Sequence, residues 1–176
     1  MIGDTPMIRE VEANLRATGV KVLDIEILRV KPDTRAINWK PFFETGARLG
    51  ASQVLVAGND PDYNRFCDNF AELCEIAHPY GLTLNVEPMP WCDIATVKAT
   101  GDAMKRVNRP NAGVLVDPIH FFRADNRYED IDALPPGSLH YCQMCDITAE
   151  RPKDMDGILY QARNFRLSPG TGAADL

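Results

Sequence analysis

The sequence predicts an α/β fold in which about five parallel strands with outer helices form part of a (β/α)8 barrel. Short apolar segments alternate with segments of helical periodicity along the chain. The strand segments recur about every 30 residues, which is the length of one βα unit. One face of these strands turns polar toward the carboxyl end, as on the axis side of a barrel, where sites are built.

Five segments are short, apolar and rich in β-branched residues or leucine, as buried strands are. Helical crossovers return the chain to the same edge of a sheet, so strands joined in this way lie parallel. The expected strands are 21–28, 53–58, 82–87, 112–117 and 139–145.

The segments between the strands place apolar residues at helical spacing. The first begins at Thr5 and Pro6, a favourable cap and first-turn pair, and stops at Gly19. The connection 119–134 is less regular and is expected to hold one short helix. The expected helices are 4–18, 38–48, 61–80, 93–107, 128–134 and a weak stretch at 158–165.

The polarity of the strand faces separates a barrel from an open sheet. In the third strand Thr83, Asn85 and Glu87 share one face, opposite Leu84 and Val86. An open doubly wound sheet buries both faces with apolar residues, so the mixed face favours a barrel. A full barrel takes about 250 residues. A chain of 176 residues is therefore expected to be one incomplete barrel domain over 1–176, with a flavodoxin-like open sheet as the alternative.

Composition and charge exclude several functional classes. The chain has 19 Lys and Arg against 25 Asp and Glu, a net charge of -6, which argues against binding to nucleic acid or to an anionic membrane. No apolar run approaches the roughly 20 residues of a membrane-spanning helix. The first residues lack the basic start and apolar core of a signal peptide, so a cytoplasmic location is expected.

The five cysteines are odd in number and scattered, which fits free thiols in a reducing compartment. Cys142 and Cys145 form a C-x-x-C, the spacing of redox and zinc pairs. We expect this segment to be part of a strand, which points the two thiols to opposite faces. A redox or zinc pair would need a turn or a helix start, so neither role is assigned.

Oxygen-bearing side chains stand at or near the carboxyl ends of successive expected strands, where parallel strands bring them to one rim. Glu87, Asp117 and Gln143 offer two carboxylates and one amide oxygen, with Glu26 near the end of the first strand. Hard oxygen ligands suit Mg²⁺ or Mn²⁺, and also Co²⁺. Two buried carboxylates without a cation are costly, so these residues predict a divalent-metal site.

Other residues near this rim are candidates for chemistry and substrate binding. His120 follows Asp117 by three residues and is expected in the loop above the rim, as a general acid or base. Trp91, after Glu87, could wall a substrate pocket. Arg166 opens a Gly-rich turn and could hold a substrate carboxylate or phosphate. His78 and His140 are assigned no function, His140 because strand alternation turns it away from the axis.

Several segments together resemble the xylose-isomerase-like TIM barrel superfamily, the group of sugar-phosphate isomerases and epimerases. The spaced set of Glu, then Asp-x-x-His, then Gln-x-x-Asp is fairly specific in combination. The similarity runs from about Gly19 to Gly172. The matching segments are 22–26, 49–56, 85–90, 114–120, 143–146 and 166–172.

The resemblance implies that the five strands are the third to seventh of eight. Glu87, Asp117 and Gln143 would be the metal ligands of the fifth, sixth and seventh strands, with His120 against the substrate. Many relatives have histidine where Gln143 stands. An amide side chain at this position recurs in a branch of the family that resembles the 3-dehydroshikimate dehydratases. These enzymes also carry the Asp-x-x-His spacing.

The chain also departs from the family pattern. The last family ligand is a glutamate on the eighth strand, which is expected beyond Leu176, and the first two strands are not found. Thr171 stands where relatives often have glutamate in the Pro-Gly-x-Gly turn. The resemblance therefore implies a barrel truncated at both ends: either a truncated member, or a natural fragment that would complete itself by association into a homo-oligomer.

The activity that the resemblance implies is that of a divalent-metal-dependent enzyme on a hydroxy-carbonyl compound, a small-molecule sugar or cyclic polyol ketone. The metal would stabilise the enediolate or enolate formed when Glu87 or His120 takes a neighbouring proton. Returning the proton gives an isomerase or epimerase, whereas expelling a β-hydroxyl gives a dehydratase, a lyase. Two alternatives remain: a catalytically incomplete half-barrel that works by self-association, and a flavodoxin-like sheet that binds a small ligand without metal.

Overall fold

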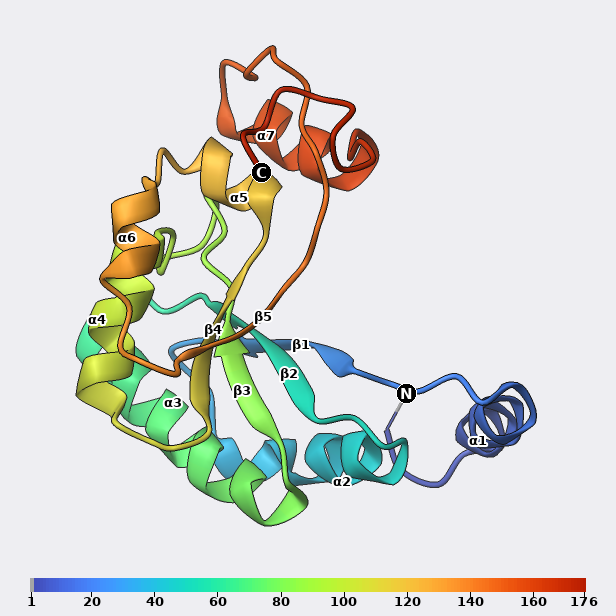
Figure 1. Ribbon diagram of the computed structural model, residues 1–176. Coiled ribbons are helices and arrows are strands. Elements are labelled where there is room, and N and C mark those ends of the chain that lie inside the picture. The colour runs from blue at the N-terminus through green and yellow to red at the C-terminus, as the bar shows by residue number, and fades with distance from the viewer. Residues whose placement is uncertain (1) are drawn as a thin grey trace.

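The chain forms a five-stranded sheet in the order β1-β2-β3-β4-β5, described over residues 2–176 in a computed structural model (Figure 1). Every pairing is parallel, and each strand pairs with the next along the chain. This arrangement confirms the predicted α/β class and the partial barrel. The strands are β1 (Asp24–Val30), β2 (Gln53–Gly58), β3 (Thr83–Val86), β4 (Ala112–Val116) and β5 (Leu139–Cys142).

Helices fill each connection as expected, with one addition. The segment after β4 was expected to be a loop but forms α5 (Pro118–Arg123), because Asp117 caps it and Pro118 supplies a first-turn proline. Two short 3-10 helices, η1 (Ala36–Trp39) and η2 (His78–Tyr80), flank the second and third helices. The other helices are α1 (Pro6–Thr18), α2 (Lys40–Arg48), α3 (Tyr63–Ala77), α4 (Val97–Val107), α6 (Tyr128–Asp132) and α7 (Met155–Asn164).

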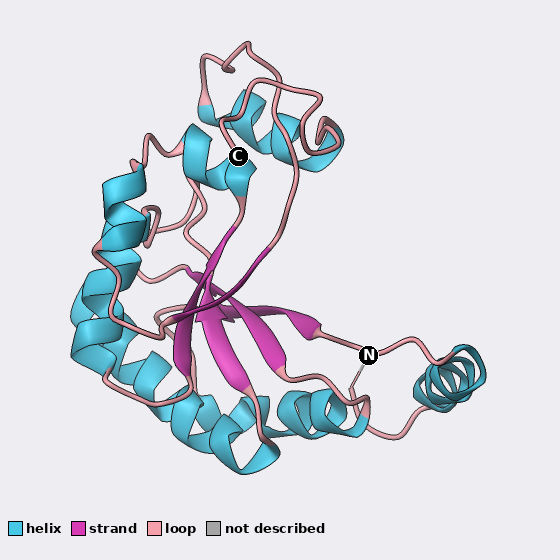
Figure 2. Cartoon of the chain, in the orientation of Figure 1, coloured by secondary structure: helices cyan, strands magenta, loops and turns pink. Residues whose placement is uncertain are grey.

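The sheet separates two apolar clusters. In β4, Val114 and Val116 belong to the large core under the outer helices, whereas Leu115 belongs to a smaller cluster on the other face. Figure 2 shows helices along the outer side of the strands, with the concave inner side facing away from them. An open doubly wound sheet would carry helices on both faces, so the flavodoxin-like alternative is wrong.

The two outermost strands approach each other across the inner face. Tyr141 of β5 donates from its hydroxyl to Asp24 Oδ2 of β1 at 2.9 Å. Just after β5, Gln143 Nε2 donates to Glu26 Oε1 at 3.1 Å. Bonds between residues from opposite edges of a sheet require strong curvature, so this sheet is the wall of a barrel section. Self-association through the edges of β1 and β5 stays a prediction.

A register shift in β5 changes the face of one histidine. Val114 pairs with Leu139 and Leu115 with Tyr141, so His140 is an extra residue between the two pairs. Its Nδ1 lies 2.7 Å from Asn85 Oδ1, on the inner face. The expectation that His140 turns away from the axis is therefore wrong, because the bulge interrupts the alternation of side chains between the two faces of the strand.

Gly113 of β4 lies against this inner-face pair. A Cβ at position 113 would overlap the imidazole of His140 and approach the amide oxygen of Asn85. We expect Gly113→Ala to lower the free energy of unfolding by about 1–3 kcal/mol, as overpacking of a tight interior does. Urea denaturation measures the change. The same substitution in a His140→Ala background should cost much less, and an equal cost there would contradict this explanation.

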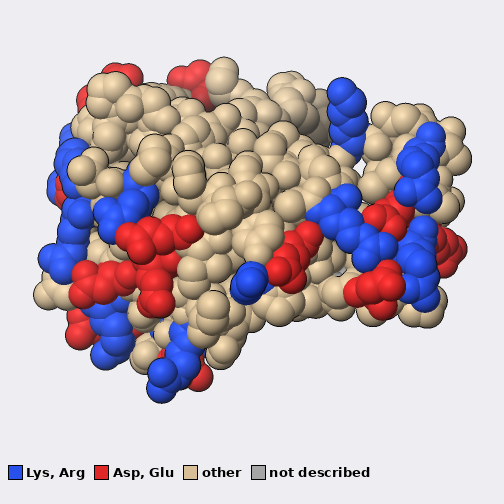
Figure 3. All heavy atoms as spheres, turned by 90° about the horizontal axis from the view of Figure 1, so that it is seen from below, with Lys and Arg blue, Asp and Glu red and all other residues tan. Residues whose placement is uncertain are grey.

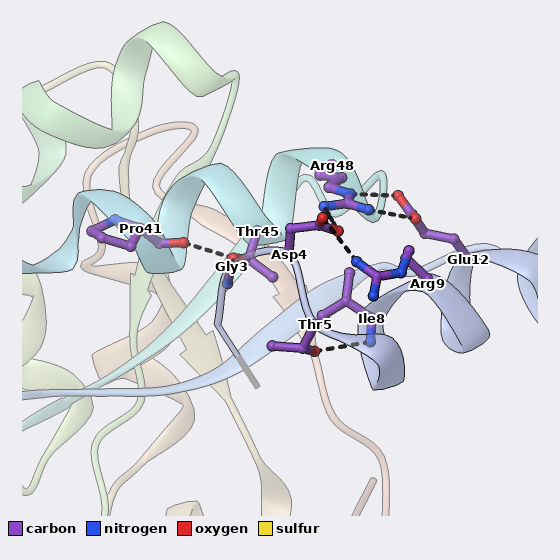
Figure 4. A network of polar contacts seen from close by, with 9 residues as sticks. All are labelled: Gly3, Asp4, Thr5, Ile8, Arg9, Glu12, Pro41, Thr45 and Arg48. Atoms are coloured by element: carbon purple, nitrogen blue, oxygen red, sulfur yellow. Dashed lines mark hydrogen bonds and ion pairs between the residues drawn. The ribbon is translucent and has the colours of Figure 1, made fainter.

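The first helix is tied to α2 by a polar network (Figure 4). Thr5 caps α1 by accepting a hydrogen bond from the amide of Ile8 at 3.2 Å, and the Ile8 side chain is fully buried. Arg48 at the end of α2 donates two bonds to Glu12, at 2.7 and 2.8 Å, and one to Asp4 at 2.9 Å. A bidentate arginine in a three-residue cluster fixes the position of α1 better than a single surface pair would.

The surface charges are mixed. On the face drawn in Figure 3, Lys and Arg side chains lie among Asp and Glu side chains. Ion pairs at the surface include Arg106–Asp68 and Arg109–Glu75, between α4 or the turn after it and α3. None of the helices in residues 2–176 combines the length and apolar character that crossing a bilayer requires.

Candidate active site

Three side chains meet at the carboxyl ends of β3 and β4. Glu87 directly follows β3, Asp117 directly follows β4, and His120 lies in α5. One ligand atom of each lies within 4.8 Å of the other two, and all three residues are buried. His120 Nε2 is 3.7 Å from Glu87 Oε1 and 3.9 Å from Asp117 Oδ2. Of the residues expected to converge at the rim, Glu87 and Asp117 lie together, and His120, which was expected above them, is the third member of the cluster.

The backbone explains why these groups meet. The amide of Glu87 donates to Val56 O at 2.9 Å, which extends the β2–β3 ladder to the rim. The carboxylate of Asp117 accepts from the amide of Ile119 at 3.0 Å and so caps α5. In a helix that starts at position 118, His120 stands one turn beyond its cap and returns over Asp117. His120 therefore belongs to a helix and not to the loop that the sequence analysis expected.

The burial of this cluster shifts the pKa values of two groups. Burial, reinforced by the carboxylates of Asp117 and Glu26, raises the pKa of Glu87 to about 8, while Arg166 opposes the shift. Burial lowers the pKa of His120 to about 4, against the opposing pull of Asp117. At pH 7 the protein without metal therefore holds Glu87 as a neutral acid and His120 as a neutral imidazole.

Two polar atoms of the cluster lack partners within residues 2–176. Glu87 Oε1 and His120 Nδ1 are buried and make no hydrogen bond. An unsatisfied buried polar atom costs about 1–3 kcal/mol, so native proteins rarely keep one without a functional reason. Two carboxylates and an imidazole around one point are a donor set that fits a divalent cation. The residues present therefore fit the predicted metal, and His120 lies directly beside the two carboxylates.

Gln143 lies at the same rim, but its contact is with a different carboxylate. Its backbone amide donates to Val116 O at 3.1 Å, which continues the ladder beyond β5. Its side-chain amide donates to Glu26 Oε1, which leaves the amide oxygen of Gln143 free of that bond. No hydrogen bond joins Gln143 to Glu87 or Asp117 in the described chain. Its role as a ligand stays a prediction.

Arg166 contacts the site directly. Its Nη1 forms an ion pair with Asp117 Oδ2 and lies 3.4 Å from Cys145 Sγ, and its Nε donates to Ala162 O. Cys145 in turn lies 3.4 Å from Asp117 Oδ1. The guanidinium thus balances the charge of a buried carboxylate, a role that the sequence analysis did not predict. The predicted role, a contact with a substrate anion, stays a prediction.

Buried Asp146 holds the turn that follows Arg166. Its two carboxylate oxygens accept from the amides of Gly170, Gly172 and Ala174 at 2.8–3.0 Å. These bonds lower the pKa of Asp146, and the backbone pairing of Asp146 with Leu167 places Arg166 beside the rim. The Pro-Gly-x-Gly sequence could have indicated such an acceptor, because the free backbone amides of a turn of this kind need a hydrogen-bond acceptor.

Trp91 stands over the histidine. The two rings meet edge to face, with centroids 4.9 Å apart. Trp91 also packs against the inner-face cluster that contains Met89 and Cys92. Trp91 therefore covers one side of His120, where a wall of a substrate pocket would stand; contact with a substrate stays a prediction.

The match to a protein family accords with this geometry. A family model described as Xylose isomerase-like TIM barrel matches residues 4–176. The chain belongs to the xylose isomerase-like TIM barrel family.

Two curated proteins that are similar to this chain have different named activities. A 3-dehydroshikimate dehydratase of Pseudomonas aeruginosa is 28% identical over 142 residues, which cover 76% of this chain and 22% of the relative. An inosose isomerase of Bacillus licheniformis is 33% identical over 107 residues, which cover 60% of this chain and 36% of the relative. This member of the family therefore spans well under half the length of either relative.

Solved structures share the barrel wall. A xylose isomerase-like TIM barrel/4-hydroxyphenylpyruvate dioxygenase fusion protein superposes with a TM-score of 0.83 at 22% identity, over 96% of this chain and 28% of the other. The IOLI protein with a binding zinc atom gives a TM-score of 0.75 at 21% identity, over 98% of this chain and 66% of the other. At these identities the likeness concerns the fold, in which the five strands form part of a TIM barrel.

Proposed function

We propose that this barrel is a divalent-metal-dependent isomerase or epimerase that removes a proton next to the carbonyl group of a hydroxy-carbonyl compound. The observation that carries the proposal is the buried group of Glu87, Asp117 and His120, with two of its polar atoms unsatisfied. A site of this kind is costly to a protein that does not use it.

Glu87, Asp117 and Gln143 would hold the ion, which is Mg²⁺, Mn²⁺ or Co²⁺, with His120 beside them. When bound, the ion supplies Lewis-acid polarisation of the substrate's carbonyl and hydroxyl oxygens. His120, kept neutral at pH 7 by burial, is the group able to accept the proton. Glu87, the other candidate base, is the protonated partner in the protein without metal. Trp91 limits the access of water to the imidazole.

The substrate class is a small-molecule sugar or cyclic polyol ketone. Inosose, in the name of one relative, is such a ketone. A second candidate function is that of a lyase, in which the same proton abstraction is followed by loss of a β-hydroxyl. The match to a 3-dehydroshikimate dehydratase over 76% of the chain favours it. Five free thiols support a cytoplasmic location.

Solvent exchange tests both functions in one experiment. The metal-depleted chain, with and without Mn²⁺, is incubated in D₂O with inosose or with 3-dehydroshikimate and followed by NMR. Deuterium beside the carbonyl supports an isomerase or epimerase, and a new double bond with loss of water supports a lyase. We expect His120→Gln to slow the reaction by about 10²–10⁴-fold, as removal of a general base does.

The control is His78→Gln, a change at an exposed histidine in η2, which should leave the rate within about twofold. Equal slowing by both substitutions would contradict the role of His120. If neither compound incorporates deuterium or loses water with Mn²⁺ present, the proposed activity on these compounds is contradicted.

A further inference from the structure

A cavity opens at the carboxyl end of β1. Its volume is about 310 Å³, and it lies between the end of β1, the following loop and η1. Cavities of roughly 300–1,000 Å³ are the size that holds small ligands. The residues on its walls that the argument uses are Arg29, Lys31, Asp33, Arg35, Asn38 and Trp39.

Strand alternation places the β1 side chains of this cavity on the inner side of the sheet. Leu28 and Val30 are buried in the core under the outer helices, whereas Ile27 packs with the inner-face cluster. Arg29 and Lys31 alternate with the outer pair and so share the side of Ile27. The β1 side chains therefore reach the cavity from the inner side, at the same end of the strands as Glu87, while Trp39 borders it from the core under the outer helices.

Three cations line the cavity without an ion-pair partner. Within residues 2–176, no carboxylate oxygen lies within 4.0 Å of the charged nitrogens of Arg29, Lys31 or Arg35. Asp33 is the single carboxylate on the wall, so the lining has a net charge of about +2 on a chain of -6.

Three other arginines of this chain are neutralised by acids, whereas the buried Arg123 is satisfied by an amide oxygen and two backbone carbonyls. Arg48, Arg65 and Arg109 each lie within 2.7 Å of a carboxylate oxygen. Arg29 instead is half-buried and bonds only to a neutral group, the amide oxygen of Asn59 at 3.4 Å. A half-buried arginine with an uncompensated charge has donors left for an anion.

Contacts connect this cavity with the candidate active site. Asn59, which accepts from Arg29, donates to Cys92 Sγ at 3.4 Å. Cys92 follows Trp91, whose ring meets that of His120. The cavity is therefore connected with the carboxylate cluster through the loop that carries Trp91 and Cys92.

We propose that this cavity binds an anionic group, a carboxylate or a phosphate, and that the substrate of the neighbouring site is a hydroxy-carbonyl compound that carries such a group. The second half of the proposal rests on the proposed function. Arg29 and Arg35 are the donors to the anion, Lys31 adds charge, and Asn38 is a neutral donor on the same wall.

The two tryptophans of the chain allow a test of each site separately, since Trp39 lines the cavity and Trp91 the active site. Metal-free Trp91→Phe protein is titrated with inorganic phosphate and with acetate, against sodium chloride at equal ionic strength. We expect a saturable change in Trp39 fluorescence with phosphate or acetate and none with chloride. Tighter binding of phosphate would identify the anionic group as a phosphate, and tighter binding of acetate would identify it as a carboxylate. Arg29→Gln with Arg35→Gln should weaken binding at least about tenfold.

The control is Arg16→Gln, at an exposed arginine on α1, which should leave the anion affinity unchanged. Circular dichroism confirms that each variant is folded. Equal response to all three salts, or equal affinity in the double variant, would overturn the anion site.

A Trp39→Phe protein, in which Trp91 reports Mn²⁺, separates this proposal from the proposed function. Anion binding without any Mn²⁺ response would contradict the function and leave the anion site standing. Mn²⁺ binding without an anion response would contradict the anion site and leave the proposed function standing. For the link to the substrate, the double variant should raise the KM for 3-dehydroshikimate, an acid, at least about tenfold and leave that for inosose, a neutral ring, within about twofold. An equal effect on both would overturn the link.

Discussion

Glu87→Gln is expected to weaken the binding of Mn²⁺ by roughly 100-fold or more, which is about 2.7 kcal/mol of binding free energy. Glu87 supplies a buried carboxylate oxygen without a hydrogen-bond partner, within 4.8 Å of ligand atoms of Asp117 and His120. An amide keeps the shape of the side chain but removes the charge that a hard cation requires. Titration of the metal-depleted protein with Mn²⁺, followed by electron paramagnetic resonance, measures the affinity.

Glu26→Gln is the matched control for this substitution. Glu26 lies at the same rim, but it is exposed and its partner is Gln143. We expect it to change the Mn²⁺ affinity by less than about tenfold, because a charge outside the cluster acts through a more polar medium. Equal losses from both substitutions would mean that the rim attracts cations only through its summed charge and that Glu87 is not a ligand.

Much of this site could be predicted from strand periodicity. A carboxylate at the end of an apolar strand segment reaches the rim whenever the strands are parallel, and Glu87 and Asp117 do so. The same reasoning failed for His140, because a bulge in β5 moves it to the inner face. A bulge depends on pairing between strands, which one strand's own sequence does not specify.

The surroundings of Asp117 could not be predicted in the same way. The sequence marks Arg166 as a basic residue before a Gly-rich turn, but its pairing with Asp117 arises because Asp146 folds that turn back onto the rim. Such contacts depend on the path of an irregular tail, for which no periodicity exists. The cap formed by Asp117 was in principle visible, because an aspartate before a proline is a signal for a helix start. The strand ends only one residue earlier, at Val116, so no loop separates the strand from the cap.

The second large effect is expected in the pH dependence of stability. In the metal-free protein, we expect the free energy of unfolding to fall by about 2 kcal/mol between about pH 6.5 and 8. Glu87 has a pKa of about 8 in the folded protein, raised from 4.5, so the folded state holds more protons than the unfolded state over this range. Stability then decreases as the pH rises, because the buried carboxyl group must finally ionise.

His120 acts in the opposite direction and at lower pH. Its pKa of about 4 in the folded protein, lowered from 6.5, means that the unfolded state holds more protons between these values. Its contribution is lost as the pH falls from about 6.5 to 4, and it offsets that of Glu87 where the two ranges overlap. Stability should therefore be nearly flat from about pH 4.5 to 6.5 and should decline only above this range.

Chemical denaturation of the metal-free protein across pH 4–8.5 measures the curve, and Glu87→Gln isolates the group. The charges that act on Glu87 belong to the same cluster and rim: Asp117, Glu26, Arg166 and Asp24. Because they remain in the variant, loss of the decline above pH 6.5 can be assigned to position 87. Glu10→Gln, at an exposed glutamate on α1, should keep the decline.

The same proton connects stability with metal binding. An ion can coordinate Glu87 only after its proton has left, so binding at pH 7 should release about one proton and should strengthen as the pH rises from 6 to 8. Calorimetry of Mn²⁺ binding in buffers of different ionisation enthalpy counts the protons. If no proton is released and the decline above pH 6.5 persists in Glu87→Gln, then Glu87 is ionised in the metal-free protein. In that case Arg166 alone would balance the negative charge of the cluster, and metal binding would not require the loss of a proton from Glu87.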